Sequence, residues 1–199
     1  TLLISEDNQK ISGALTLKGG ALNVAEGKSF THGTINVTGG KSTVSAINGN
    51  IVGNVNVASG QLRIGQPLNL TGDISLTNDS LLMVDVKGPG VADKVKIDGK
   101  VILDSSSKID WLLPEEFENL DYFELFTADE IVMEDGSPVD WETVMEDLDG
   151  WIVSEDENEF GEMVVALTKD LSLPEPSTWA IMLMGIFGIG FLRKKRAAK

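Results

Sequence analysis

Only a few side chains in this 199-residue chain could carry out catalysis. The chain has no cysteine, which excludes thiolate chemistry and disulfide bonds. His32 is the only histidine, and its place beside Gly33 favours a solvated loop histidine over a general base. A Ser-His-Asp arrangement stays open from the sequence, but no G-x-S-x-G nucleophile elbow accompanies it.

Carboxylates recur in the second half of the first hundred residues: Asp73, Asp79, Asp85, Asp93 and Asp98. Glycan-degrading enzymes built on repetitive β-structure need clustered carboxylates or basic residues on one exposed face. Arg63 is the only arginine before residue 193, so no obvious basic partner set accompanies the aspartates. We therefore predict a non-enzymatic protein, with a polysaccharide lyase or hydrolase as an alternative function.

Two acidic segments look like pieces of a calcium-binding loop. One is Asp147 to Gly150, and the other is Asp156 to Gly161, which has Asp, Asn and Gly at the first, third and sixth EF-hand positions. The second segment fails at the fifth position, Phe160, and at the twelfth, Leu167. We predict no metal site and no cofactor. Weak binding of divalent cations by the acidic surface stays open, and a solvated acidic face is the favoured interpretation.

The C-terminal residues indicate recognition and membrane contact rather than catalysis. Two prolines hold a short extended segment in front of an apolar run, and a basic cluster follows the run, which favours a cytoplasmic position for the cluster. The extended motif is Pro174, Glu175, Pro176, Ser177, Thr178 and Trp179. The apolar run is Trp179, Ala180, Ile181, Met182, Leu183, Met184, Gly185, Ile186, Phe187, Gly188, Ile189, Gly190, Phe191 and Leu192. The basic cluster is Arg193, Lys194, Lys195 and Arg196.

This tripartite ending resembles the PEP-CTERM sorting signal of Gram-negative bacteria. The resemblance implies recognition of Pro174-Glu175-Pro176 by an exosortase-like membrane enzyme, a transient anchor in the inner membrane and a basic stop. The 14 apolar residues would span roughly 21 Å as a helix, which is shorter than the roughly 30 Å hydrocarbon core. A buried core helix is the alternative, whereas a marginal anchor suits a segment that is later removed.

Charge is unevenly distributed along the chain. The net charge is −15, and residues 101–173 hold 22 acidic and only 2 basic residues. An acidic body repels nucleic acid, so we predict no nucleic-acid partner. The opening Thr1-Leu2-Leu3-Ile4 does not resemble a signal peptide, which leads us to expect a fragment or the C-terminal end of a longer protein.

Apolar-x-apolar pairs recur with a period near 20 residues, often followed by glycine. The first set is Leu15/Leu17, Ile35/Val37, Val55/Val57, Ile74/Leu76 and Val95/Ile97; the second is Leu22/Val24, Ser42/Val44, Leu62/Ile64, Leu82/Val84 and Val101/Leu103. Such a period predicts a mainly β chain, specifically a right-handed parallel β-solenoid over residues 1–104. An antiparallel sandwich is the alternative fold. With Asn-Val-x-x-Gly pieces such as Asn56 to Gly60, this stretch also resembles an autotransporter passenger repeat.

Residues 105–172 predict a small acidic α+β cap on the last coil. We expect a strand at Tyr122 to Phe126, a helix from Trp141 to about Leu148 capped by Asp140, and a hairpin of Trp151 to Val153 with Met163 to Leu167. Residues 173–199 complete the chain as the sorting signal with a single transmembrane helix.

The whole pattern predicts an exported structural protein of the cell surface or the extracellular biofilm matrix, anchored in the inner membrane before processing. Extracellular polysaccharide is its candidate partner. A glycan-binding adhesin is the alternative, although almost all aromatic residues fall outside the repeats.

Overall fold

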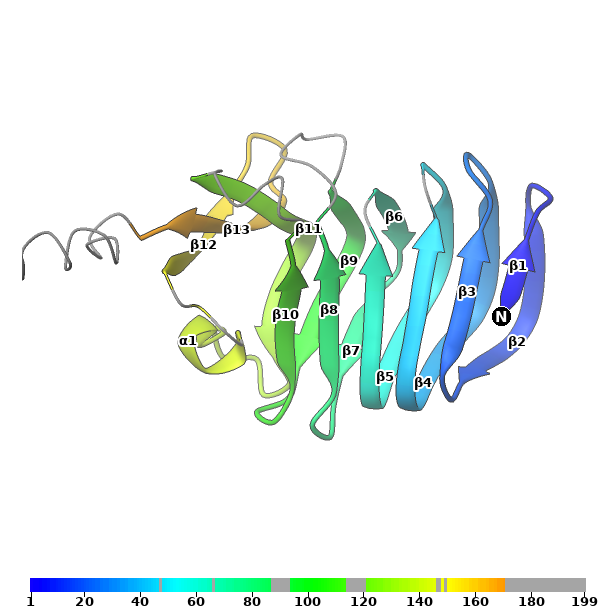
Figure 1. Ribbon diagram of the computed structural model, residues 1–199, viewed down its shortest axis with the longest axis horizontal. Helices are drawn as coiled ribbons and strands as arrows, with labels where there is room; N and C mark the ends of the chain where they lie inside the picture. The colour runs from blue at the N-terminus through cyan, green and yellow to red at the C-terminus, as the bar shows by residue number, and fades with distance from the viewer. Residues whose placement is uncertain are drawn as a thin grey trace, which may run out of the picture. The chain divides into compact units, whose positions relative to one another are not determined.

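The alternating apolar residues form strands that pair in parallel, one repeat against the next (Figure 1). The computed structural model describes residues 1–46, 48–65, 67–86, 94–113, 121–145, 148 and 150–170. Residues 1–169 form one compact unit. Within the described residues, the strands join a single 13-stranded sheet.

The strands of the first repeats are β1 (Leu2–Ile4), β2 (Gln9–Leu17), β3 (Gly20–Val24), β4 (Ser29–Ala46), β5 (Asn50–Gly65), β6 (Leu68–Thr71), β7 (Ile74–Leu76) and β8 (Leu81–Asp85). The later elements are β9 (Val95–Leu103), β10 (Lys108–Leu112), β11 (Tyr122–Met133), α1 (Trp141–Val144), β12 (Trp151–Glu157) and β13 (Met163–Lys169).

The register stacks equivalent residues of successive repeats on one another. Leu15 is paired with Ile35, Ile35 with Val55 and Val55 with Ile74. A second ladder joins Leu22 to Val44, Val44 to Ile64 and Ile64 to Val84. The 20-residue spacing aligned Leu22 with Ser42, and this predicted pairing is wrong by two residues. A third ladder, absent from the sequence prediction, joins Phe30, Ile51, Leu70 and Ile97. The inward residues of these ladders merge into one apolar core.

The predicted phase of the last repeat is wrong. Val95 pairs with Leu68 in the third ladder, whereas Val101 pairs with Ile74 and so continues the first. The chain between Asp85 and Val95 is longer than the turns between earlier strands, which breaks the 20-residue spacing. The 20-residue spacing therefore assigned Val95/Ile97 and Val101/Leu103 each to the wrong ladder.

The predicted fold class is correct in being mainly β, but its more specific form is wrong. The strands do not form a clear solenoid, because β5, β6, β9 and β7 close a barrel-like ring of parallel pairings. β5 and β9 are long enough for β6 to pair with one part of each and β7 with another part.

The predicted α+β cap is corrected as well, since α1 is only four residues long. Asp140 stands at its N-cap position as expected, but the helix ends at Val144 rather than near Leu148. The next residue, Met145, is extended and buried, and it bridges to Ile109 of β10. Burial of Met145 against the sheet therefore overrides the helical pattern.

The end of the sheet is built from antiparallel strands. β11 pairs in parallel with β9 and in antiparallel fashion with β13, which forms the predicted hairpin with β12. Phe123 and Phe126 of β11 are fully buried, and Phe123 packs edge-on against Trp151 at 5.0 Å between ring centroids. No helix in the described part of the chain has the length and apolarity needed to cross a bilayer. The predicted membrane helix, Trp179 to Leu192, lies outside the described residues.

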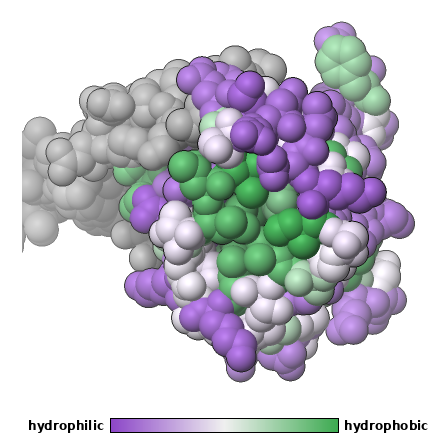
Figure 2. All heavy atoms as spheres, turned by 90° about the vertical axis from the view of Figure 1, so that its right-hand side faces the viewer, coloured by the Kyte–Doolittle hydropathy of each residue, from purple (hydrophilic) through white to green (hydrophobic). Residues whose placement is uncertain are grey.

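The opposite end of the sheet leaves apolar residues partly uncovered. Edge strands β1 and β2 each pair with one neighbour within the described residues. They hold Leu2, Leu3, Ile11 and Leu15, none of which is fully buried. Figure 2 shows apolar atoms at the centre of this end, with polar atoms around them.

Glycines at equivalent positions of successive repeats form a column in which backbones lie very close. A Cβ added to Gly53 would lie 2.4 Å from the carbonyl oxygen of His32, and one added to Gly72 would lie 2.5 Å from that of Gly53. Both residues have positive φ angles, 135° and 142°, which side chains rarely adopt. These glycines are therefore stacking positions within the fold as well as turn residues.

We expect Gly72→Ala to lower the free energy of unfolding by about 2–4 kcal/mol, because it adds both backbone strain and a steric clash. Gly13 occupies the edge of the same column, and nothing lies within 4 Å of its added Cβ. Gly13→Ala should therefore change stability by less than about 0.5 kcal/mol. Denaturant unfolding of both variants measures the difference, and equal losses would contradict the stacking role.

Candidate functional site

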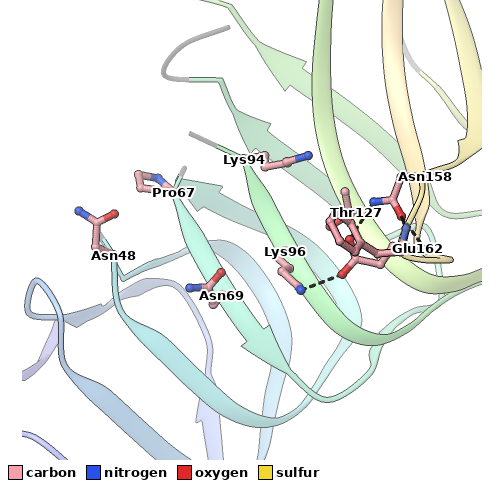
Figure 3. A pocket seen from close by; sticks show the side chains of 9 residues that line it. Asn48, Pro67, Asn69, Lys94, Lys96, Thr127, Asn158 and Glu162 are labelled. Carbon is pink, nitrogen blue, oxygen red and sulfur yellow. Dashed lines mark hydrogen bonds and ion pairs between the residues drawn. The ribbon is translucent and has the colours of Figure 1, made fainter. Parts of the chain in front are cut away.

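A polar groove of about 490 Å³ lies between the sheet and the turn of the last hairpin (Figure 3). Its floor is a ladder of register partners, Asn69 of β6, Lys96 of β9 and Thr127 of β11. Their outward positions follow from strand alternation, because the residues before and after Asn69 and Lys96 point into the core. The rest of the lining consists of Asn48, Pro67, Lys94, Asn158, Phe160 and Glu162.

Both lysines of the groove are neutralised by carboxylates. Lys94 pairs with Glu124, while the Lys96 ammonium lies 2.7 Å from Glu162 and 3.3 Å from Asp98. The hydrogen bond to Glu162 is the main reason why the pKa of Lys96 is raised, and Asp98 adds to it against partial burial. The pKa of Glu162 is lowered by its bonds to Lys96 and Asn158. The groove therefore holds charged groups without a strong local excess of charge.

The hairpin turn over the groove is organised by Asn158. Its side-chain oxygen accepts backbone N–H bonds from Phe160 at 2.9 Å and Glu162 at 3.0 Å, and its amide nitrogen donates to the Glu162 carboxylate at 2.9 Å. These bonds form an Asx-type turn that holds the chain in one conformation. Phe160 is carried at the tip, where 77% of its surface is exposed.

His32 is not the solvated loop residue that the sequence predicted. It lies in β4, 4% exposed, with its ring 5.5 Å from that of Phe30. Neither ring nitrogen has a hydrogen-bond partner among the described residues, and burial lowers the pKa of His32. The alternation of β4, with Phe30 and His32 both inward, was the sequence signal for this burial.

Three of the repeat aspartates, Asp73, Asp85 and Asp98, take part in hydrogen bonds or ion pairs within the fold. Asp85 forms a two-point ion pair with Arg63, with contacts of 2.8 Å, so the lone arginine does have an acidic partner. Asp73 accepts the backbone N–H of Lys100 at 2.9 Å, and Asp98 pairs with Lys96. Asp79 is exposed in a turn, and Asp93 lies outside the described residues.

Asp104 is a carboxylate held by an unusually large number of hydrogen bonds. It accepts backbone bonds from Asn78 at 2.6 Å, Ser106 at 3.0 Å and Ser107 at 2.8 Å, together with both serine hydroxyls. Burial raises the pKa of Asp104, but these hydrogen bonds outweigh it and hold the pKa at about 2. Its role is to organise a turn.

The calcium-like segments divide between described and undescribed residues. Asp156 to Gly161 forms the end of β12 and the hairpin turn, whereas Asp147 and Asp149 lie outside the described residues. The described residues contain no group of three or more His, Asp or Glu side chains that could hold a metal ion.

The predicted sorting residues are not placed by the structure. The motif Pro174 to Trp179, the apolar run to Leu192 and the basic cluster Arg193 to Arg196 all lie outside the described residues. No family model, curated protein or solved structure matches this chain. The PEP-CTERM and autotransporter resemblances therefore stay predictions.

Sequence reasoning did not find the groove, because its residues are spread from Asn48 to Glu162 and meet only in the folded chain. A partial signal was present in Asn69 and Lys96, which are polar residues at outward positions of apolar strands. Phe160 stands out in the sequence only because an apolar residue does not fit the fifth position of a calcium-binding loop.

We expect stability to fall as the pH drops below about 6.5, because the unfolded chain then binds a proton at His32 that the folded chain disfavours. The stability that the neutral His32 contributes is fully present above that pH. As the pH falls toward the lowered pKa of the folded state, the free energy of unfolding decreases by at most about 1.4 kcal/mol per pH unit. Urea unfolding at pH 7.5 and 5.5 should therefore show a smaller loss for His32→Leu than for the unchanged protein. An identical pH dependence would contradict the buried neutral histidine.

We expect Asp104→Asn to lower the free energy of unfolding by about 2 kcal/mol at pH 7, because the amide cannot accept all of the backbone bonds. The lowered pKa means that the wild-type advantage exists above about pH 4 and is lost as the pH falls toward 2. The gap between the two proteins should therefore narrow from pH 5 to pH 3. Asp79→Asn, in an exposed neighbouring turn, is the control and should stay within about 0.5 kcal/mol.

Proposed function

We propose that this chain is an exported, non-enzymatic structural protein of the cell surface or extracellular matrix, delivered by its C-terminal sorting signal. The observation that carries the proposal is the order Pro174-Glu175-Pro176, apolar run and basic cluster within the last 26 residues. An exosortase-like enzyme recognises the first part, the inner membrane takes the second transiently, and the third stays on the cytoplasmic side.

A structural role is supported by the described ionisable groups, several of which are buried or bonded within the fold. His32 is buried in the core, Asp104 organises a turn and Asp85 pairs with Arg63. The lowered pKa values of His32 and Asp104 favour a neutral imidazole and an ionised carboxylate near neutral pH, and both groups are therefore poorly suited to proton transfer there. A sheet with one continuous core suits a spacer that must keep its shape outside the cell.

The acidic later part of the chain supports an exposed location. Residues 101–173 carry a large excess of acidic residues, and exposed carboxylates keep a surface soluble. The same excess disfavours nucleic acid as a partner. A neutral extracellular polysaccharide is not repelled by the acidic surface, and we propose it as the material that surrounds the protein.

Replacement of Pro174, Glu175 and Pro176 by alanine should stop maturation in the native host. Mass spectrometry of the C-terminal peptide should show the unchanged protein ending near Pro174 to Pro176 at the surface or in the medium. The alanine variant should retain Lys199 and stay with the membrane fraction.

The matched control replaces Leu171, Ser172 and Leu173 by alanine, which changes the spacer next to the motif and should leave processing intact. Equal processing of the motif variant and the unchanged protein would overturn the proposal. Loss of processing in the control alone would show that a different segment is recognised, with the same consequence.

A further inference from the structure

We propose that the groove between β6, β9 and the β12–β13 turn is a binding site for a neutral carbohydrate. This inference goes beyond the proposed structural role, because it gives the body of the protein a ligand. It does not depend on the tail, so it can fail or succeed separately from the sorting proposal.

The charges around the groove favour a neutral ligand. Lys94 and Lys96 would attract an anion if they were free, but each is paired with a carboxylate, as described above. Glu162 is engaged by Lys96 in the same way, so it does not offer a free carboxylate to a cation. What the groove offers to a ligand is therefore hydrogen bonding rather than net charge.

The hydrogen-bonding groups of the groove suit hydroxyl groups. The Asn69 amide is exposed and makes no side-chain hydrogen bond with the described residues, so it has two donors and an acceptor to offer. Asn48 lies on the same side of the groove as Asn69, and its side chain makes one long bond of 3.5 Å to Glu26 among the described residues. Sugar hydroxyls both donate and accept, which matches these two neighbouring amides (Figure 3).

Phe160 supplies the apolar surface that a sugar ring needs. It is the most exposed of the large apolar side chains in the described residues, and it lines the groove. Asn158 fixes the turn that carries it, and the Lys96–Glu162 ion pair ties this turn to the sheet. An exposed aromatic ring at the edge of the groove is suited to stacking on the C–H face of a sugar, whose hydroxyls can then reach the amides.

The size of the groove agrees with this ligand. Small-molecule sites have volumes of roughly 300–1,000 Å³, and the groove, at about 490 Å³, lies within this range. It is also prepared before binding, because its turn and its lysines are already held by hydrogen bonds and ion pairs. Less ordering cost then opposes binding.

The test is calorimetric titration of the full chain, kept in a detergent without a sugar headgroup, with cellotetraose, laminaritetraose and mannotetraose. We expect at least one of these neutral oligosaccharides to bind with a Kd in the millimolar range or tighter. Phe160→Ala should weaken that binding about tenfold or more, which corresponds to about 1.4 kcal/mol. Asn69→Ala should weaken it as well.

Leu3→Ala is the matched control, because Leu3 is also a large exposed apolar side chain, 62% exposed, and belongs to β1 rather than the groove. It should leave the affinity unchanged. Absence of binding by all three sugars, or equal affinity in the Phe160 and Leu3 variants, would overturn the proposal. Binding of polygalacturonate alone, abolished by salt, would also overturn it in favour of an anion site.

Discussion

In-register parallel pairing between successive repeats is the constraint on which the rest of this structure depends. Because each residue lies beside its equivalent in the next repeat, apolar residues stack on apolar residues, as Leu15, Ile35 and Val55 do. The same rule places Gly72 against Gly53, where the carbonyl of one repeat occupies the space that a side chain of the next would need. A change at one such position is therefore felt by the neighbouring strand as well as by its own.

The ladder also explains where a groove can form. Within the parallel region, each strand pairs with the equivalent strand of the next repeat, so the surface is regular and offers few recesses. At β11 the direction of pairing changes, because β11 meets β9 in parallel and β13 in antiparallel orientation. The turn of the β12–β13 hairpin then projects beside the outward residues of β6 and β9, and the space between them is the groove. One wall is formed by parallel strands and the other by the turn of an antiparallel hairpin.

Ion pairs between the two differently charged parts of the chain gather near β9 and β11, where parallel pairing gives way to antiparallel pairing. Lysines of the nearly neutral first hundred residues meet glutamates of the acidic segment: Lys94 meets Glu124, Lys96 meets Glu162 and Lys100 meets Glu130. Exposed pairs contribute little stability individually. The Lys96–Glu162 pair joins the hairpin turn to β9, and the other two pairs join β11 to this part of the sheet. They also leave the groove without excess charge, which decides the class of ligand that it suits.

Much of the β-structure was predictable, because alternation and a 20-residue period are local properties of the chain. The first ladder, from Leu15 to Ile74, and the final hairpin followed from the sequence alone, whereas the pairing of Leu22 with Val44 did not. Closure of the ring through β5, β6, β9 and β7, the shift of Val95 to another ladder and the short α1 did not, because they depend on which distant strands compete for pairing. The sorting signal is likewise a linear pattern, whereas the burial of His32 and the groove at Phe160 exist only once residues far apart in the chain are packed together.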